Sequence, residues 1–289
     1  MNARTLLLMV AGVFFLSLMG VFAKLATNHL PFLEVVFGRG VLGVLCLVPL
    51  ARHRKVGLFG KRRRLLAMRG LFGFVAVACY VFALSRISLA DVVATNRIAP
   101  ILMVLLAHHL LGEAVPRSIY LIAGLAFLGA LTVIRPGFGL ANLGGAAALC
   151  SAVCSAVAFT LVKILSDESK ESVVFYQYFF SMILAGLLGA HEFVLPDLAT
   201  LGLLLGMSGF SVVGQLLTTE GYQHGLLSRV SLLTFLSVIF SAGWDLLVWG
   251  QVPDLWSALG AVLVLLSCLW LGLSKSQRPP RTARAGNPA

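Results

Sequence analysis

The chain has 289 residues, of which 59% are hydrophobic and 11% are charged, and its formal net charge is +11. A soluble globular domain carries about 25% charged residues, so this chain has too little polar surface to cover a soluble fold. The composition excludes a soluble enzyme, a disordered chain and a soluble nucleic-acid-binding domain, and it indicates an integral membrane protein.

Ten apolar segments of membrane-spanning length follow one another along the chain. A spanning helix needs about 20 apolar residues, with a range of roughly 17–25. Short turns with polar residues separate the segments. These connections are too short to contain a domain outside the membrane. The predicted helices cover residues 5–26, 31–50, 66–85, 89–111, 117–134, 143–165, 172–190, 199–219, 227–249 and 255–273.

The basic residues predict how the chain sits in the membrane. Two basic stretches, 51–64 and 275–284, directly follow apolar segments, and short Lys- and Arg-rich segments mark the cytoplasmic side. With a cytoplasmic N-terminus, seventeen of the 22 Lys and Arg residues fall on the cytoplasmic side and three on the other. We therefore expect a multi-pass protein of the cell (inner) membrane with both termini in the cytoplasm. No aromatic residues alternate with the basic ones to stack on bases, so lipid is the expected contact and no nucleic-acid partner is expected.

The two halves of the chain resemble each other weakly. A displacement of 138 residues sets Phe37-Gly38-Arg39 over Phe175-Tyr176-Gln177, and Gly112-Glu113 over Gly250-Gln251. Five helices per half is an odd number, so a duplicated half must enter the membrane in the opposite orientation. Inverted repeats place a binding site at their interface near the bilayer centre. We predict an all-α fold with two inverted five-helix repeats around a central cavity, residues 1–138 and 139–274, and a basic tail at 275–289.

Several motifs resemble the EamA-type proteins of the drug/metabolite transporter superfamily. The likeness rests on Ala83-Leu84, Leu89-Ala90-Asp91, Pro100, and Leu110-Leu111-Gly112-Glu113. It continues through Gly124 and Gly129 to Arg135-Pro136-Gly137, and it includes Arg39 in the second helix. In the second half, Val238 stands where the proline would repeat, and Gln251 replaces the glutamate. The resemblance implies ten helices around a cavity and export or exchange of small metabolites.

Two arginines, Arg39 and Arg97, lie about nine residues into helices that start on the outer side. Both are therefore about 13 Å from the outer boundary, at 1.5 Å per residue. A charge at that depth is costly, and no carboxylate accompanies them. Such arginines suit an anionic substrate group, because guanidinium pairs with carboxylate in a bidentate geometry. The alternative is a packing role, with bonds to backbone carbonyls or, for Arg39, to Glu34.

The sequence around Arg97 predicts irregular backbone. Pro100 frees the carbonyl of Asn96 one turn earlier, and exposed backbone at membrane depth is tolerated where it lines a cavity. We therefore expect Thr95, Asn96 and Arg97 to line the site, with Pro100 as a hinge.

Other polar and aromatic residues within the spans are candidate lining groups. Ser237, Ser241 and Trp244 share one helix face through their i, i+4, i+7 spacing, although hydroxyls also serve ordinary helix packing. Further candidate substrate-binding residues are Tyr80, Tyr176, Gln177 and Gln215.

Lys24 and Lys163 occupy matching places near helix ends in the two halves. They either extend to the membrane surface or act as polar gates at opposite mouths. His108 and His109 are adjacent, so they point about 100° apart on a helix and predict no metal site. The five cysteines all lie in apolar segments and predict no disulfide framework.

The expected function is export of small metabolites, such as amino acids or related carboxylate compounds, by alternating access. No enzymatic motif and no nucleotide-hydrolysing loop is present, so we expect no catalysis and no cofactor. Without a central acid to relay protons, facilitated diffusion or exchange is favoured. The alternatives are uptake of a larger metabolite, such as S-adenosylmethionine, riboflavin or a nucleotide-like compound, and a membrane scaffold without transport.

Overall fold

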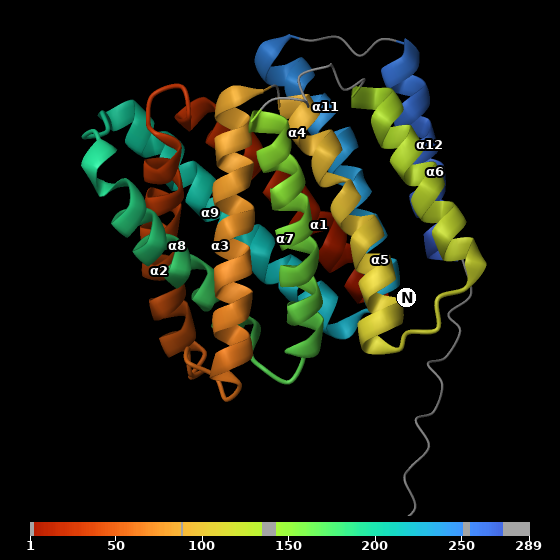
Figure 1. Ribbon diagram of the computed structural model, residues 1–289, viewed down its shortest axis with the longest axis horizontal. Helices are drawn as coiled ribbons and strands as arrows, with labels where there is room; N and C mark the ends of the chain where they lie inside the picture. Colours follow the sequence, from red (N-terminus) through yellow and green to blue (C-terminus); the bar gives the residue numbers. More distant parts are fainter. Residues whose placement is uncertain (1–2, 88, 135–142, 251–254, 274–289) are drawn as a thin grey trace, which may run out of the picture.

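The computed structural model describes residues 3–87, 89–134, 143–250 and 255–273, and these form a bundle of helices without strands (Figure 1). The first half contains α1 (Ala3–Ala26), α2 (Phe32–His53), α3 (Arg63–Arg86), α4 (Leu89–Asn96), α5 (Ile98–Leu111) and α6 (Arg117–Ile134). The second half contains α7 (Leu143–Ile164), α8 (Lys170–Gly189), α9 (Leu198–His224), α10 (Leu227–Val230), α11 (Leu236–Trp249) and α12 (Leu255–Leu273). Two short 3₁₀ helices, η2 (Ala190–Glu192) and η3 (Ser231–Phe235), complete the described elements.

These helices reproduce the ten predicted spans. Seven segments in the described ranges are long and apolar enough to cross a membrane, namely α1, α2, α3, α7, α8 with η2, α9, and the stretch from Leu227 to Trp249. The pair α4–α5 together with α6 and α12 supplies the remaining three. Because every backbone group in a bilayer core needs an internal partner, an all-helical bundle is the expected solution for this composition.

Two of the ten predicted spans are interrupted, and the sequence indicated only the first interruption, beside Pro100. The span 89–111 is divided at Arg97 into α4 and α5, and the span 227–249 is divided into α10, η3 and α11. These are the fourth spans of the two halves, so the interruptions correspond to each other. A third difference is the end of α9, which continues to His224 rather than ending at residue 219.

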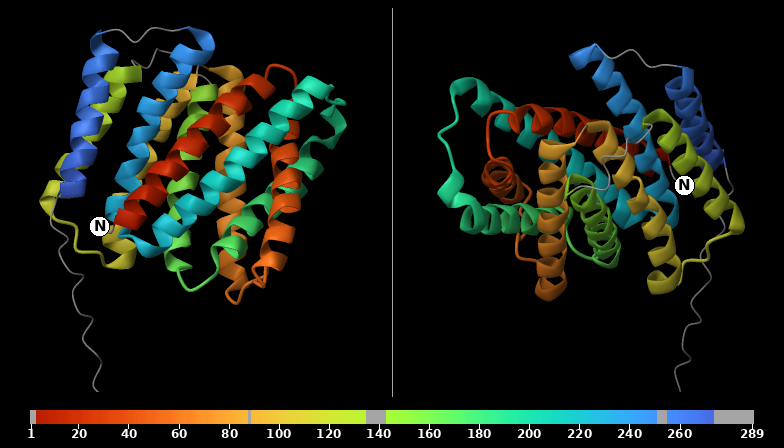
Figure 2. Two further views of the ribbon diagram at one scale, coloured as in Figure 1. Left: turned by 180° about the vertical axis from the view of Figure 1, so that it is seen from behind. Right: turned by 45° about the horizontal axis from the view of Figure 1, so that its top comes forward.

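The helix packing is symmetric between the halves, which supports the inverted repeat. The central contacts of α1 with α9 correspond to those of α3 with α7, and α1 with α11 corresponds to α5 with α7. The pairs α2–α8 and α6–α12 each join equivalent helices, and they lie at opposite edges of the bundle (Figures 1 and 2). The all-α fold with two inverted repeats is therefore confirmed. The proposed boundary at residues 138 and 139 and the tail 275–289 lie outside the described residues.

The loops predicted to share one side of the membrane do lie at one end of the bundle. Glu220 at the end of α9 pairs with Arg4 at 2.6 Å and with Lys170, and Arg54 bonds Glu171 at 2.8 Å. The start of α1, the stretch after α2 and the turn before α8 therefore meet there, at the lower end of Figure 1.

Candidate functional site

A cavity lies between the two halves. Its walls come from α1, α3, α7, α9 and the two interrupted spans, with Arg39 contributed by α2. Eight of the predicted site residues line it: Arg39, Tyr80, Asn96, Arg97, Pro100, Gln215, Ser237 and Ser241. Most of the site predicted from the sequence is thus brought together in one place.

Arg97 lies at the interruption between α4 and α5 and bridges to the interruption of the other half. Its Nε donates to the carbonyl of Val93 at 3.2 Å, and its Nη1 donates to the carbonyl of Thr234 in η3. The third nitrogen, Nη2, has no hydrogen bond to the described residues. Arg97 is also one of the residues that line the cavity. A guanidinium has donors on all three nitrogens, so the side chain joins the two broken helices and still presents N–H groups to a ligand.

Arg39 is fully buried and is held differently. Its Nε donates to Ser211 Oγ at 2.8 Å, and its guanidinium carbon lies 4.5 Å from the centre of the Tyr178 ring. It does not pair with Glu34, whose carboxylate accepts from the Val194 amide at 2.9 Å. Its Nη1 and Nη2 have no hydrogen-bond partner among the described residues.

The cavity wall carries positive charge and hydroxyl groups. No Asp or Glu is among the lining residues that the structure describes. The hydroxyl-bearing lining residues include Tyr80 and Tyr222, and the aromatic wall continues with Phe159. An anionic or strongly hydrogen-bonding ligand group therefore fits this wall better than a cation.

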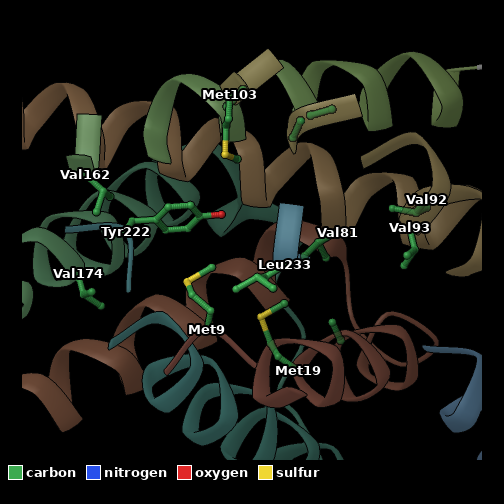
Figure 3. Close-up of a cluster of buried hydrophobic side chains, with 14 of the residues drawn as sticks. Met9, Met19, Val81, Val92, Val93, Met103, Val162, Val174, Tyr222 and Leu233 are labelled. Carbon is green, nitrogen blue, oxygen red and sulfur yellow. The ribbon is translucent and has the colours of Figure 1, made fainter. Parts of the chain in front are cut away.

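Tyr222 is a lining residue that the sequence analysis missed. Figure 3 shows its hydroxyl directed toward the space between Met103 and Leu233, and the group is buried without a hydrogen-bond partner in the described chain. A sequence signal existed, because the polar residues of α9 follow one helical stripe. The members of that stripe are Ser208, Ser211, Gln215, Thr218 and Tyr222.

Four of the predicted substrate-binding residues are not among the lining residues. Trp244 donates from its indole nitrogen to Ser17 Oγ at 2.9 Å, so it supports a lining residue from behind. Tyr176 donates to the carbonyl of Phe59 at 3.1 Å, and Gln177 accepts from Arg69 at 2.8 Å. Thr95 is buried in the last turn of α4. Their predicted contact with substrate is untested.

Arg69 was counted from the sequence with the cytoplasmic residues, but only 1% of it is exposed. It lies in α3 and reaches α8 through Gln177, and its guanidinium carbon is 5.5 Å from the centre of the Phe159 ring. Its position beside a basic stretch hid this role in the sequence. Arg69 is therefore a third cation of the bundle interior.

The two predicted gate lysines have matching partners. Lys24 donates to the carbonyls of Leu84 and Ile87, where α3 ends, and Lys163 donates to the carbonyl of Gln223 at 3.0 Å, where α9 ends. Each lysine reaches a carbonyl 60 residues further along its own half. They therefore stabilise helix ends at opposite ends of the bundle, and their predicted gating role is untested.

The end of α5 is tied to the start of α10 by Glu113. Its carboxylate accepts hydrogen bonds from the Leu227 amide at 2.8 Å, the Ser228 amide at 3.1 Å and the Ser228 hydroxyl at 2.7 Å. Free amides at a helix start favour an anionic acceptor. The glutamate of the Leu-Gly-Glu motif thus connects the interrupted span of one half to that of the other.

The described residues contain no cluster of three or more His, Cys, Asp or Glu side chains that could hold a metal ion. Four cysteines in this part of the chain are free: Cys46, Cys79, Cys150 and Cys154.

Comparison with known proteins identifies relatives over the whole bundle. Residues 3–135 and 142–273 each match the EamA-like transporter family. The pseudopaline exporter of Pseudomonas aeruginosa is 32% identical over 272 residues, which cover 93% of this chain and 96% of the exporter. Human solute carrier family 35 member G1 is 24% identical over 84% of this chain and 72% of its own length. A solved crystal structure superimposes with a TM-score of 0.81 over 94% of this chain and 98% of that chain, at 16% identity, which shows the shared fold.

Proposed function

The chain belongs to the EamA-like transporter family of the drug/metabolite transporter superfamily, and we propose from this that it exports small metabolites bearing a carboxylate, such as amino acids or related compounds. Transport proceeds by alternating access of the central cavity. The similarity to an exporter over 93% of the chain supports export as the direction.

The observation that carries the substrate class is the charge of the cavity wall. Arg39 and Arg97 line the cavity, while no acidic side chain does so in the described residues. An unpaired cation in a region of low dielectric is costly. A substrate carboxylate offsets that cost and gains charge-assisted hydrogen bonds.

Arg97 is the proposed first contact of the carboxylate. The carbonyls of Val93 and Thr234 fix the direction of its guanidinium, so little side-chain freedom is lost when a ligand binds. The same bonds connect the site to both interrupted spans. A carboxylate that binds Arg97 therefore acts on α4 and η3, which belong to the two interrupted spans. Substrate binding is in this way coupled to the movement of the two halves.

The lining residues also bear on energy coupling. The described lining residues include no Asp or Glu, so the cavity contains no carboxylate among them that could relay protons. We therefore propose facilitated diffusion or exchange. Both termini are proposed to lie in the cytoplasm and the protein in the inner membrane, because the basic loops gather at one end of the bundle. A membrane-impermeant thiol reagent that reacted from the periplasm with a cysteine placed at residue 57 would contradict this orientation.

The test uses purified protein in liposomes and pairs of probes that differ only in the carboxylate. Phenylalanine and leucine are compared with phenylalaninamide and leucinamide, and other amino acids extend the panel. Wild type should transport the acids and discriminate strongly against the amides. Arg97→Gln should lose this discrimination, since a charge-assisted bond contributes roughly 1.5–3 kcal/mol, or about ten- to a hundred-fold in affinity.

Arg97→Lys supplies the graded comparison. It retains the charge but lacks the planar fork, so transport should fall while a preference for the acid persists. Arg117→Gln, an exposed arginine at the start of α6, is the matched control and should behave as wild type. If Arg97→Gln keeps the full preference for acids, Arg97 has only a structural role. If no acid in the panel moves or shifts the melting temperature, the carboxylate carrier is the wrong assignment, and the same assay then tests nucleotide-like compounds.

A further inference from the structure

A second polar cluster borders the cavity on the side of α2, α8 and α9. Arg39 Nε donates to Ser211 Oγ at 2.8 Å, and the same hydroxyl is 2.8 Å from the Tyr178 hydroxyl. The Arg39 guanidinium lies over the Tyr178 ring at 4.5 Å. Arg39 is therefore held on one edge by a hydroxyl and on one face by an aromatic ring, which fixes the direction of its remaining donors.

Those remaining donors have no partner among the described residues. Arg39 has no exposed surface, and its Nη1 and Nη2 form no hydrogen bond within the described chain. Nη1 and Nη2 carry four of the five guanidinium N–H groups. Arg39 is also a lining residue of the cavity. An anionic acceptor stabilises a cation buried in this way, and Arg39 borders the cavity from which a ligand can supply one.

The acids nearest in sequence or packing are already engaged elsewhere. Glu34 on α2 accepts from the Val194 amide. At the opposite end of the bundle, Glu171 on α8 pairs with Arg54, and Glu220 on α9 pairs with Arg4 and Lys170. The carboxylates of α2, α8 and α9 therefore all bind other groups near the ends of these helices. No carboxylate of these three helices is therefore available to Arg39, which leaves a ligand in the cavity as its anionic acceptor.

Arg69 adds a second buried cation behind this wall. It donates from Nη2 to Gln177 Oε1 at 2.8 Å, and Gln177 precedes Tyr178 on α8. Its Nε and Nη1 are buried without a partner in the described residues. Arg69 does not line the cavity, so it acts by adding positive charge beside Arg39 rather than by contact.

The close packing of α2 on α8 is built into the sequence. A Cβ at Gly43 would lie 2.2 Å from the Tyr178 ring, and one at Gly40 would lie 2.5 Å from the Met182 amide nitrogen. Only glycine at these positions allows the ring of Tyr178 to approach α2 and stack on Arg39. The direction of Arg39 is therefore a specified feature of the packing.

We propose that the cavity takes a substrate with two anionic groups, one received by Arg97 and the other by Arg39. This rests on the proposed carboxylate transport and narrows its substrate class to compounds with at least two acidic groups. Arg97 is anchored on α4 and η3, whereas Arg39 is anchored on α8 and α9. Because the anchors belong to different helices, each arginine receives its own anionic group, and the distance between the groups becomes a determinant of specificity.

The test compares straight-chain dicarboxylates with monocarboxylates of equal length. Succinate, glutarate and adipate are paired with butyrate, valerate and hexanoate, and binding is measured by the shift in melting temperature and by competition in liposomes. Wild type should bind the best dicarboxylate about ten- to a hundred-fold more tightly than its monocarboxylate partner. Arg39→Gln should remove this advantage, so that the dicarboxylate and the monocarboxylate of each pair bind about equally.

The controls separate charge from folding. Arg64→Gln replaces an exposed arginine of α3 and should retain the full advantage. Arg39→Lys keeps the charge and should retain part of the advantage even if Arg39→Gln does not fold. Ser211→Ala removes the hydrogen bond to Arg39 Nε and keeps the charges of Arg39 and Arg97. It should weaken dicarboxylate binding more than monocarboxylate binding.

The outcomes distinguish this proposal from the broader one. If wild type binds monocarboxylates and dicarboxylates equally, the second subsite is wrong and the carboxylate carrier stands. If neither series binds, the carboxylate carrier itself is wrong. If Arg39→Gln folds and keeps the dicarboxylate advantage, Arg39 is a packing residue and the second anionic group is bound elsewhere.

Discussion

The fourth spans of the two halves are both interrupted, but only one contains proline. Pro100 is the third residue of α5, and Val238 is the third residue of α11. The first span breaks at one residue, Arg97, whereas the second passes through the five residues of η3. Proline is therefore not required to interrupt the fourth span. The second break has other support, from Thr234 bonding the Ser231 carbonyl and from Arg97 bonding the Thr234 carbonyl.

The two breaks are also connected differently at their ends. Glu113, at the end of the first interrupted span, accepts three hydrogen bonds at the start of the second. The sequence places Gln251 at the matching position of the second half, but that residue lies outside the described ranges. The Leu-Gly-Glu end of the first half is thus a specific attachment point for the second.

The largest expected effect comes from removing this attachment. Glu113→Ala leaves two amides and a hydroxyl without an acceptor, so the free energy of unfolding should fall by about 3 kcal/mol. Glu113→Gln keeps one uncharged acceptor oxygen and should lose about half as much. Thermal unfolding in detergent measures both. Asp167→Asn, which disrupts an exposed pair with Arg62 at 3.3 Å, is the control and should cost less than about 1 kcal/mol.

The matched lysines allow the symmetry itself to be tested. Lys24→Met and Lys163→Met keep the apolar stems and remove the bonds to carbonyls at the ends of α3 and α9. Each should lower stability by roughly 1–2 kcal/mol. If the lysines gate the cavity, both variants should also slow transport without changing substrate affinity. A stability loss with unchanged transport rates would restrict both residues to stabilising helix ends.

The support for η3 should be weaker and local. Thr234→Val removes the hydroxyl that bonds the Ser231 carbonyl at 2.7 Å and preserves the branched shape, so stability should fall by about 1 kcal/mol. Transport should also fall, because the lost hydroxyl holds the η3 turn, and the backbone carbonyl of Thr234 in that turn accepts the hydrogen bond from Arg97. Thr27→Val removes an equivalent bond to the Lys24 carbonyl at 2.8 Å. It should change stability similarly and leave transport as in wild type.

The smallest effect should come from giving the second half its missing proline. Val238 is the third residue of α11, the place that Pro100 holds in α5, so Val238→Pro should change stability by less than about 1 kcal/mol. Val213→Pro in the interior of α9 should cost about 3 kcal/mol or more. A large loss from Val238→Pro in thermal unfolding would show that the two breaks are less alike than their positions indicate.

Local features of the sequence predicted the spans, the repeat and the depth of the charged residues. Apolar length is a local property, so the ten spans could be counted, and the depth of Arg39 and Arg97 followed from their positions within them. Pro100 similarly indicated the break beside Asn96, where α4 ends. The cavity then gathered eight of the residues singled out from their chemistry.

The hydrogen-bond partner of each polar group depends on tertiary packing and could not be predicted from the sequence. The 3₁₀ turn at Ser231–Phe235 carries no local breaking residue, so only its contacts with the other half disclose it. Arg69 was counted with the cytoplasmic residues because it follows the basic stretch 51–64, yet α8 packs against it and buries it. Arg97 and Arg39 looked equivalent from depth alone. Their difference depends on which carbonyls, hydroxyls and rings the facing helices present, and such contacts join residues more than a hundred positions apart.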